Sequence, residues 1–168
     1  ELEQAKKRGA KIYGEIIGGA INSGGQRGEG TMTAPNPEGV QRCIQQAIEN
    51  AEINPGSIDA ICGHLTSTMG DVMEIKNWSK ALTRAGEEFP YINSLKSMIG
   101  HCLGAAGSIE CVAAILQLNG GFFHPTINCE EIHPEIEKVV NSSKIPKNLI
   151  EQTNFNIIAK SSFGFGDV

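Results

Sequence analysis

The feature that most constrains the fold is an alternation of short apolar runs with longer amphipathic stretches, punctuated by glycine and proline. The apolar runs are rich in β-branched residues and are typical of strands, whereas the stretches between them repeat apolar residues at helical spacing. The runs cover residues 11–21, 58–62, 90–94, 122–128 and 154–166. This order predicts an α/β fold with helices packed on a central sheet.

Three main helices are expected between these strands. The first has the clearest start, because Asn36 can cap it and Pro37 suits its first position. The second covers residues 70–86, and the third runs from about His101 to Leu118. The second is expected to face inward with Val72, Ile75, Trp78 and Leu82. A long irregular stretch at 128–154 precedes the last strand, and no composition change marks an internal boundary. Residues 1–168 are therefore expected to form a single domain.

Composition excludes several classes of function. The net charge of −5 includes no run of Lys or Arg, so neither nucleic acid nor an anionic membrane is expected as a partner. No apolar run is expected to be long enough to span a bilayer. The five cysteines are odd in number and no signal peptide is recognised, which favours reduced thiols in the cytoplasm. The Gly-rich loop at 22–30 lacks the Lys-Ser/Thr ending of a phosphate-binding loop.

Two histidines follow strands at positions suited to chemistry. His64 comes after the run at 58–62, and His101 comes after the run at 90–94. Ligands of open α/β sheets bind at the carboxyl ends of the strands, where both residues should lie. His101 should also begin a helix, and the positive end of the helix dipole favours a neutral ring that donates a hydrogen bond. Such a donor suits stabilisation of an oxyanion or enolate.

Simpler interpretations compete with this one. Either histidine could be a structural residue whose hydrogen bonds are satisfied within the fold. A zinc site can be drawn from Cys62, His64, His101 and Cys102, but its spacings differ from those of known structural sites. Lys96 could be a surface lysine or a buried partner for Glu74 or Asp71, and spacing alone leaves these alternatives open.

Five stretches of the chain resemble the C-terminal half of a β-ketoacyl–acyl carrier protein synthase, a condensing enzyme of the thiolase-like superfamily. The stretches are "RGAKIYGEIIGG", "GHLTSTMGDVMEIK", "INSLKSMIGHCLGAAGSIE", "PTIN" and "SSFGFG". The third and the fifth are specific to the family, and together the five extend over essentially the whole chain. The resemblance implies a layered βαβαβαββ half with a central mixed sheet and helices on its faces.

The resemblance also implies a reaction and its residues. The family transfers an acyl chain to a cysteine, decarboxylates a malonyl thioester and joins the two by Claisen attack, with no cofactor. His64 and His101 match the histidines that stabilise the enolate, and Lys96 matches the lysine that supports them. The other matched positions are Glu74 as the ionic partner of Lys96, Asp71 as a supporting residue, Phe165 as a gate to the acyl pocket, and Thr66, Thr68 and Phe163 as substrate contacts.

The implied partners are an acyl carrier protein, acyl and malonyl thioesters, an N-terminal half that supplies the nucleophilic cysteine, and a second copy in a homodimer. None of the five cysteines of this chain has the small-residue turn expected around that nucleophile. The chain alone is therefore expected to be inactive. Leu65 in place of Gly, Ser161 in place of Asn and Asp167 in place of Gly indicate a divergent subfamily. A non-catalytic partner subunit that determines chain length, and a metal-binding or purely structural domain, are the alternatives.

Overall fold

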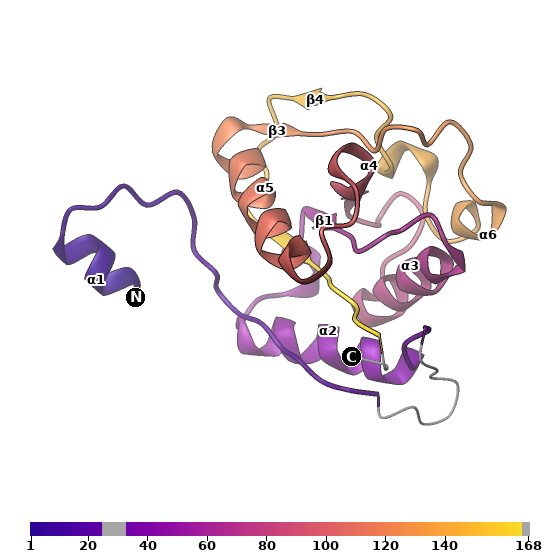
Figure 1. Cartoon of the computed structure of the whole chain (residues 1–168), viewed down its shortest axis with the longest axis horizontal. Coiled ribbons are helices and arrows are strands. Elements are labelled where there is room, and N and C mark those ends of the chain that lie inside the picture. Colours follow the sequence, from indigo (N-terminus) through magenta and orange to yellow (C-terminus); the bar gives the residue numbers. More distant parts are fainter. Residues whose placement is uncertain (25–32, 166–168) are drawn as a thin grey trace.

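Three short parallel strands form the centre of the molecule (Figure 1). The computed structural model describes residues 1–24 and 33–165. Strands β1 (Ala60–Cys62), β2 (Tyr91–Asn93) and β5 (Ile158–Lys160) lie in the order β2-β1-β5. Within this register Cys62 lies opposite both Asn93 and Lys160. The three strands therefore end together at one edge of the sheet.

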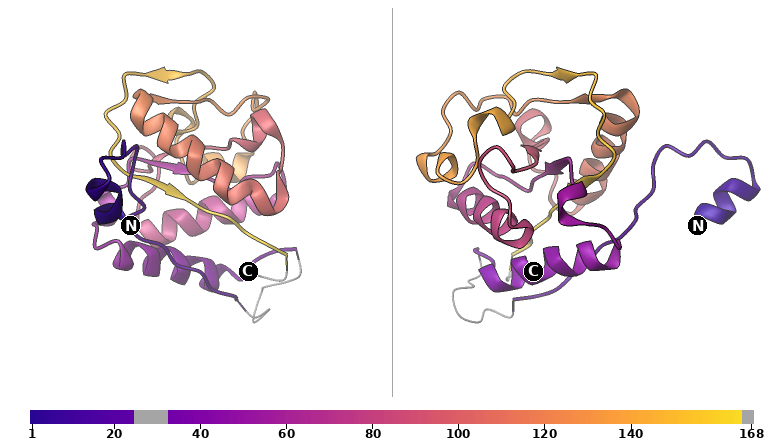
Figure 2. Two further views of the ribbon diagram at one scale, coloured as in Figure 1. Left: turned by 60° about the vertical axis from the view of Figure 1, so that its left-hand side comes forward. Right: turned by 180° about the vertical axis from the view of Figure 1, so that it is seen from behind.

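Helices cover both faces of this sheet, with α2 and α3 on one face and α5 on the other (Figures 1 and 2). The helices are α1 (Leu2–Lys7), α2 (Pro37–Asn50), α3 (Met69–Leu82), α4 (Lys96–Ile99), α5 (Ala106–Gly120) and α6 (Pro134–Glu137). Single 3-10 turns lie at Pro55–Ser57, Leu103–Ala105 and Ser142–Lys144. Strands β3 (Phe122–Phe123) and β4 (Ile150–Glu151) form a separate antiparallel pair. The described strands of the central sheet are all parallel.

The core lies between the sheet and the pair α2 and α3. All three residues of β1 are buried, as expected for a strand that is covered on both faces. Ile75, Trp78 and Leu82 of α3 are at most 4% exposed and face this core, which confirms the inward face predicted for that helix. The apolar spacing of α3 thus fixes the position of the loop that precedes it.

Helix α2 begins as the sequence predicts. The side chain of Asn36 accepts a hydrogen bond from the Glu38 amide at 3.0 Å, and Pro37 occupies the first helical position. Helix α3 is capped in the same way by Thr68, whose hydroxyl accepts from the Gly70 amide at 3.2 Å. Each cap satisfies an amide that has no partner within its helix.

The strand expected at residues 11–21 is not formed. This segment is extended and exposed, and it lies across an apolar groove of about 370 Å³ from β5 and α2. The hydrogen bonds described for the backbone of this segment are made with side chains. For example, the Gly19 amide donates to Asn50 Oδ1 at 3.0 Å. A run of β-branched residues becomes a strand only beside another strand, and the described residues place none beside this one.

Other boundaries also differ from the prediction. The strand expected at 122–128 is limited to Phe122–Phe123, and the helix expected at 70–86 ends at Leu82. Helix α5 begins at Ala106 rather than at His101, because a separate turn occupies Leu103–Ala105. The final strand is limited to β5, and β4 lies inside the stretch 128–154 that was predicted to be irregular. These differences are of the kind expected where tertiary pairing decides where a strand begins and ends.

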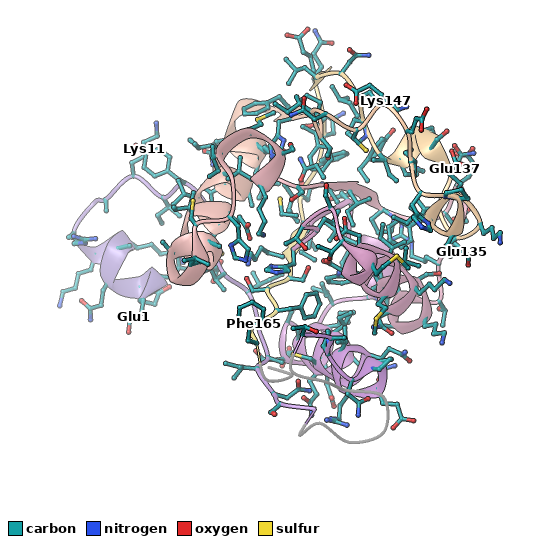
Figure 3. All side chains as sticks on the ribbon, turned by 45° about the vertical axis from the view of Figure 1, so that its right-hand side comes forward. Glu1, Lys11, Glu135, Glu137, Lys147 and Phe165 are labelled. Carbon is teal, nitrogen blue, oxygen red and sulfur yellow. The ribbon has the colours of Figure 1, made fainter. Side chains whose placement is uncertain are left out.

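The N-terminal stretch lies away from the core. Glu1 and Lys11 lie on an N-terminal arm that projects from the body, and helix α1 within it buries no residue (Figure 3). Part of the glycine-rich loop at 22–30, and Asp167, lie outside the described residues. The stretch Leu103–Gly120 is apolar and long enough to cross a membrane by length and composition, with 22% of it buried. The expectation that no apolar run is long enough to span a membrane is therefore wrong for this stretch. Glu110, in its middle, forms ion pairs with Lys96 and Lys160.

Candidate active site

Three aromatic side chains meet where the parallel strands end. The ring centroids of His64 and His101 are 5.2 Å apart, and the two rings are nearly perpendicular. Phe163 lies three residues beyond β5, and its ring is 5.6 Å from that of His64, also edge to face. The sheet thus brings together side chains that are 37 and 99 residues from His64 in the sequence. Their common position at the carboxyl edge is the one predicted for a ligand site.

His64 is held in its neutral form. Burial lowers the pKa of His64 to about 4, and the positive charges of Lys96 and, when protonated, His101 act in the same direction. The Nδ1 atom is buried and has no hydrogen-bond partner in the part of the chain that the structure describes. At neutral pH the ring is therefore uncharged, with one nitrogen that carries a proton and one that does not.

The orientation of His101 is fixed by the turn that follows it. Its Nδ1 atom accepts a hydrogen bond from the Leu103 amide at 3.0 Å. A nitrogen that accepts cannot carry the proton, so the neutral ring has its N–H at Nε2. His101 is exposed, which leaves this N–H free to donate to a ligand. The helix dipole was expected to favour a neutral His101 ring that donates, but α5 begins only at Ala106. The local turn sets the tautomer instead.

A buried ionic cluster lies beside the two histidines. Lys96 of α4 forms an ion pair with Glu110 of α5, and the side chains are 6% and 3% exposed. Lys160, the last residue of β5, is 14% exposed and lies 2.9 Å from the other carboxylate oxygen of Glu110. Lys96 is therefore buried, but its partner is Glu110. The ion pair expected between Lys96 and Glu74 is wrong.

Glu74 supports the backbone of His64 rather than Lys96. Its carboxylate accepts hydrogen bonds from the amides of His64 and Leu65 at 2.8 and 3.0 Å and from the Ser161 hydroxyl at 2.6 Å. Burial raises the pKa of Glu74, while these three donors oppose the shift. Lys96 extends from α4 towards α5, whereas Glu74 lies on α3, and this is why the two side chains belong to different clusters.

Asp71 continues the same support along the loop. One carboxylate oxygen accepts from the Thr66 amide at 2.8 Å, and the other accepts from the Ser67 amide at 3.0 Å. The hydroxyls of Thr66 and Thr68 are 3.1 Å apart. Four consecutive amides, from His64 to Ser67, are therefore held by two acidic residues of α3. This bracing gives the loop after β1 a defined course.

A cleft of about 870 Å³ opens beside this loop. It is lined by Lys96 and His101 together with the predicted substrate contacts Thr66 and Thr68. Phe165 is 80% exposed and lies on the C-terminal stretch beyond β5 (Figure 3). Asp71 also lines this cleft, whereas Phe163 lines the groove beside α2 and Phe165 points to solvent. His64 and Glu74 lie outside the lining of both openings.

The cysteines and the metal alternative can be judged from the same geometry. Burial raises the pKa of Cys62 to about 12, so this thiol stays protonated at neutral pH. Its sulfur accepts a hydrogen bond from Gln117 at 3.5 Å. Within residues 1–24 and 33–165, no three His, Cys, Asp or Glu side chains are arranged to hold a metal ion. The four residues of the possible zinc site therefore do not come together as one.

Sequence reasoning missed three members of the site: Glu110, Lys160 and Ser161. Glu110 is a single carboxylate within the apolar run "SIECVAAIL", and Lys160 is a single cation at the end of "NIIAK". A charged residue inside an apolar helix or strand is rarely buried without a partner of opposite charge. Glu110 and Lys160 therefore each indicated that such a partner should exist. Ser161 was noted only as a difference from the family, but it bonds both Glu74 and the Trp78 indole, at 2.6 and 3.4 Å.

The fold and the site define an α/β domain that places two histidines and a buried lysine at the edge of a parallel sheet. The sequence profile described as "Beta-ketoacyl synthase, C-terminal domain" matches residues 13–130. The chain belongs to this family. The predicted thiolase-like fold class is confirmed, because the chain superposes on solved ketosynthases.

Named relatives agree with this assignment. The chain is 40% identical to "3-oxoacyl-[acyl-carrier-protein] synthase I, chloroplastic" of Arabidopsis thaliana, over 98% of this chain and 33% of that protein. It is 39% identical to "3-oxoacyl-[acyl-carrier-protein] synthase 1" of Haemophilus influenzae, over 99% of this chain and 38% of that protein. The chain thus spans about a third of the length of these curated relatives.

Solved structures show the same similarity in three dimensions. "The ishigamide ketosynthase/chain length factor" superposes with a TM-score of 0.84 at 31% identity, covering 98% of this chain and 38% of that one. A "type II PKS acyl-carrier protein in complex with its ketosynthase bound to the hexaketide" superposes with a TM-score of 0.81 at 33% identity, covering 97% and 38%.

Proposed function

We propose that this chain is the C-terminal catalytic half of a 3-oxoacyl-[acyl-carrier-protein] synthase, an acyltransferase that condenses acyl and malonyl thioesters. The observation that carries the proposal is the His64–His101 pair, whose rings are 5.2 Å apart. A pKa of about 4 keeps His64 neutral at physiological pH. Two imidazoles side by side can each donate one hydrogen bond to the same carbonyl oxygen, which is the requirement for an enolate site.

The reaction begins with transfer of an acyl group from a carrier thioester to a cysteine of the N-terminal half. A malonyl thioester then places its carbonyl oxygen between the two histidines. Its carboxylate leaves as CO₂, and the electron pair of the broken C–C bond moves into the enolate, whose oxygen accepts from His64 and His101. The enolate carbon then attacks the acyl-cysteine carbonyl. A new C–C bond forms, the C–S bond breaks and the cysteine thiolate is released.

The remaining predicted residues surround these two in defined roles. Glu74 and Asp71 fix the loop that carries His64, and Lys96 supplies positive charge behind the pair. Thr66, Thr68 and Phe163 contact substrate in this proposal. Phe165 gates the acyl pocket from the segment after β5, which requires it to turn from its exposed position.

The test uses a protein that joins this chain to its N-terminal half. CO₂ release from malonyl-carrier protein and acyl mass on cysteine are measured for the parent and for His101→Ala. We expect the variant to lose about 10²–10³-fold in decarboxylation, the cost of removing one oxyanion donor, while acylation continues. Acylation therefore serves as an internal control for folding. Unchanged decarboxylation in His101→Ala would falsify the proposal.

The chain-length-determining partner subunit is the second candidate. The departure at Leu65 and the similarity to ketosynthase/chain length factor structures favour it. The same experiment separates the two functions, because such a subunit binds the carrier protein but takes no acyl group onto cysteine. If the protein behaves in this way, the function assigned to it is that of the partner subunit and not that of the condensing enzyme.

Partners and location complete the proposal. A solved relative is a ketosynthase in complex with an acyl-carrier protein, which supports a carrier protein as partner here. We place residues 1–168 as one domain, the whole protein as a homodimer, and its location as cytoplasmic. Fractionation of cells tests the location directly, since the named relatives include chloroplastic and mitochondrial proteins.

A further inference from the structure

Lys160 is the member of the site for which the proposed reaction assigns no task. It ends β5, and its side chain turns to the face of the sheet that α5 covers, where Glu110 lies. The next residue, Ser161, turns to the opposite face and bonds Glu74 of α3. The register places Lys160 opposite Cys62, two residues before His64. Its ammonium is thus fixed by the sheet beside the histidine site.

The cluster around Lys160 carries an excess of positive charge. Lys96 and Glu110 alone would form a neutral pair, each less than one-tenth exposed. Lys160 adds a second cation to the same carboxylate, so one carboxylate faces two ammonium groups. Its distance of 2.9 Å from Glu110 Oε2 lacks hydrogen-bond geometry, and its nearer contact is the Ser162 hydroxyl. The cluster therefore has a net charge of +1 in a largely buried position.

Helix α5 leaves room for this second cation. A side-chain carbon added at Gly107 would lie 3.7 Å from the Lys160 ammonium and 3.6 Å from the Ser162 hydroxyl. Gly107 thus borders the place that the ammonium occupies, and a long side chain there would compete for it. Gly104, by contrast, has open space around it. Of these two glycines in "GAAG", only Gly107 would bring an added carbon within van der Waals contact of the cluster.

We propose that Lys160 is a positioning residue of the histidine pair, because its ammonium makes the buried Lys96–Glu110 cluster cationic and so opposes a positive charge on His64 while favouring the enolate. Its effect on catalysis rests on the proposed function, whereas its effect on His64 does not. The charged groups around His64 are Lys96, Glu110 and Lys160 together with His101, and Glu74 faces its backbone. Burial is the largest cause of the low pKa of His64, and Lys160 acts in the same direction as burial.

The first measurement is an NMR titration of His64 in this chain, in the parent and in Lys160→Met. We expect the pKa of His64 to rise in Lys160→Met and to stay at its parent value in Lys160→Arg, which keeps the charge. Lys138→Met is the matched control, because Lys138 also shares a glutamate with another lysine, but that glutamate, Glu135, is 40% exposed rather than buried. An unchanged His64 pKa in Lys160→Met overturns the inference.

A double variant separates charge from packing. Lys160→Met alone makes the cluster neutral, whereas Lys160→Met combined with Glu110→Gln leaves Lys96 alone and restores a charge of +1. We therefore expect the pKa of His64 to be low again in the double variant. If Lys160 is only a counterion that stabilises Glu110, the double variant shows no return. Lys160→Gln, which is uncharged but polar, replaces Lys160→Met if the latter does not fold.

The second measurement is decarboxylation of malonyl-carrier protein by the protein that includes both halves. We expect Lys160→Met to lower kcat about tenfold, equivalent to about 1.4 kcal/mol, and Lys160→Arg to restore most of it. Parent-like kcat together with a parent-like His64 pKa refutes the role of Lys160. If the parent itself releases no CO₂, the proposed function fails, and the NMR titration still decides the electrostatic role.

Discussion

Replacement of Glu110 by Gln tests the buried cluster most directly. Glu110→Gln keeps the shape of the side chain but removes its charge, which leaves two ammonium groups without a counter-charge. The side chains of Lys96, Lys160 and Glu110 are 6%, 14% and 3% exposed, so solvent can do little to compensate. We expect a large loss of stability for this reason.

The magnitude follows from the burial of the partners. Removal of one member of a buried ion pair costs about 3–5 kcal/mol, because the remaining charge is left without compensation. Here two cations lose their partner, which places the cost at the upper end of that range. With a urea m-value of about 2 kcal/mol/M, the unfolding midpoint should fall by about 2.5 M. Such a loss is a large part of the about 5–15 kcal/mol that holds a typical domain together.

The chain contains a matched control at its surface. Glu135 also binds two lysines, Lys76 at 3.0 Å and Lys138, but its side chain is 40% exposed. Urea unfolding of Glu110→Gln and Glu135→Gln, followed by circular dichroism, compares the same chemical change in the two environments. We expect Glu135→Gln to move the midpoint far less, because water screens exposed pairs. Equal shifts in the two variants would show that burial does not set the energy of the cluster.

Three further predictions concern the same region. The stability of the chain should fall as the pH drops from about 6.5 to about 4. The reason is that unfolded His64 takes up a proton in that window, whereas folded His64, with its pKa of about 4, does not. In a plot of the urea midpoint against pH, His64→Gln should flatten this part. Glu74→Gln leaves one carbonyl oxygen for the amides of His64 and Leu65, so hydrogen exchange at these amides should accelerate and stability should fall by about 1–3 kcal/mol; exchange at the parent rate would contradict the bracing role. Asn36→Ala removes the cap on the Glu38 amide and should cost about 1 kcal/mol by thermal unfolding, with no loss expected if solvent replaces that bond fully.

Local signals predicted much of the helical structure. The cap at Asn36 and the inward face of α3 depend on neighbours within one or two turns, and both are confirmed. The position of the histidines also followed from local order, because any residue after a parallel strand reaches the same edge of the sheet. The features that could be predicted were therefore those that depend on residues close together in the sequence.

The parts that failed depend on partners far away in the sequence. The segment 11–21 has the composition of a strand, but it has no strand beside it among the described residues. Lys96 was assigned to Glu74 because the family motif suggested it, whereas the partner is Glu110 on another helix. Lys160 is 64 residues from Lys96, and only the register of β5 shows that they share one carboxylate.

The pairing of Cys62 with Lys160 restricts where this chain can change its length. Successive residues of β5 and the segment after it serve opposite faces of the sheet, Lys160 towards α5 and Ser161 towards α3. A single residue inserted or deleted between β5 and Phe163 would therefore exchange the two faces and separate the ammonium from its carboxylate. The exposed residues at 130–131 and 147–149 lie outside both sheets and can absorb such changes. Length variation should accordingly accumulate there, while the spacing from Ile158 to Phe163 stays fixed.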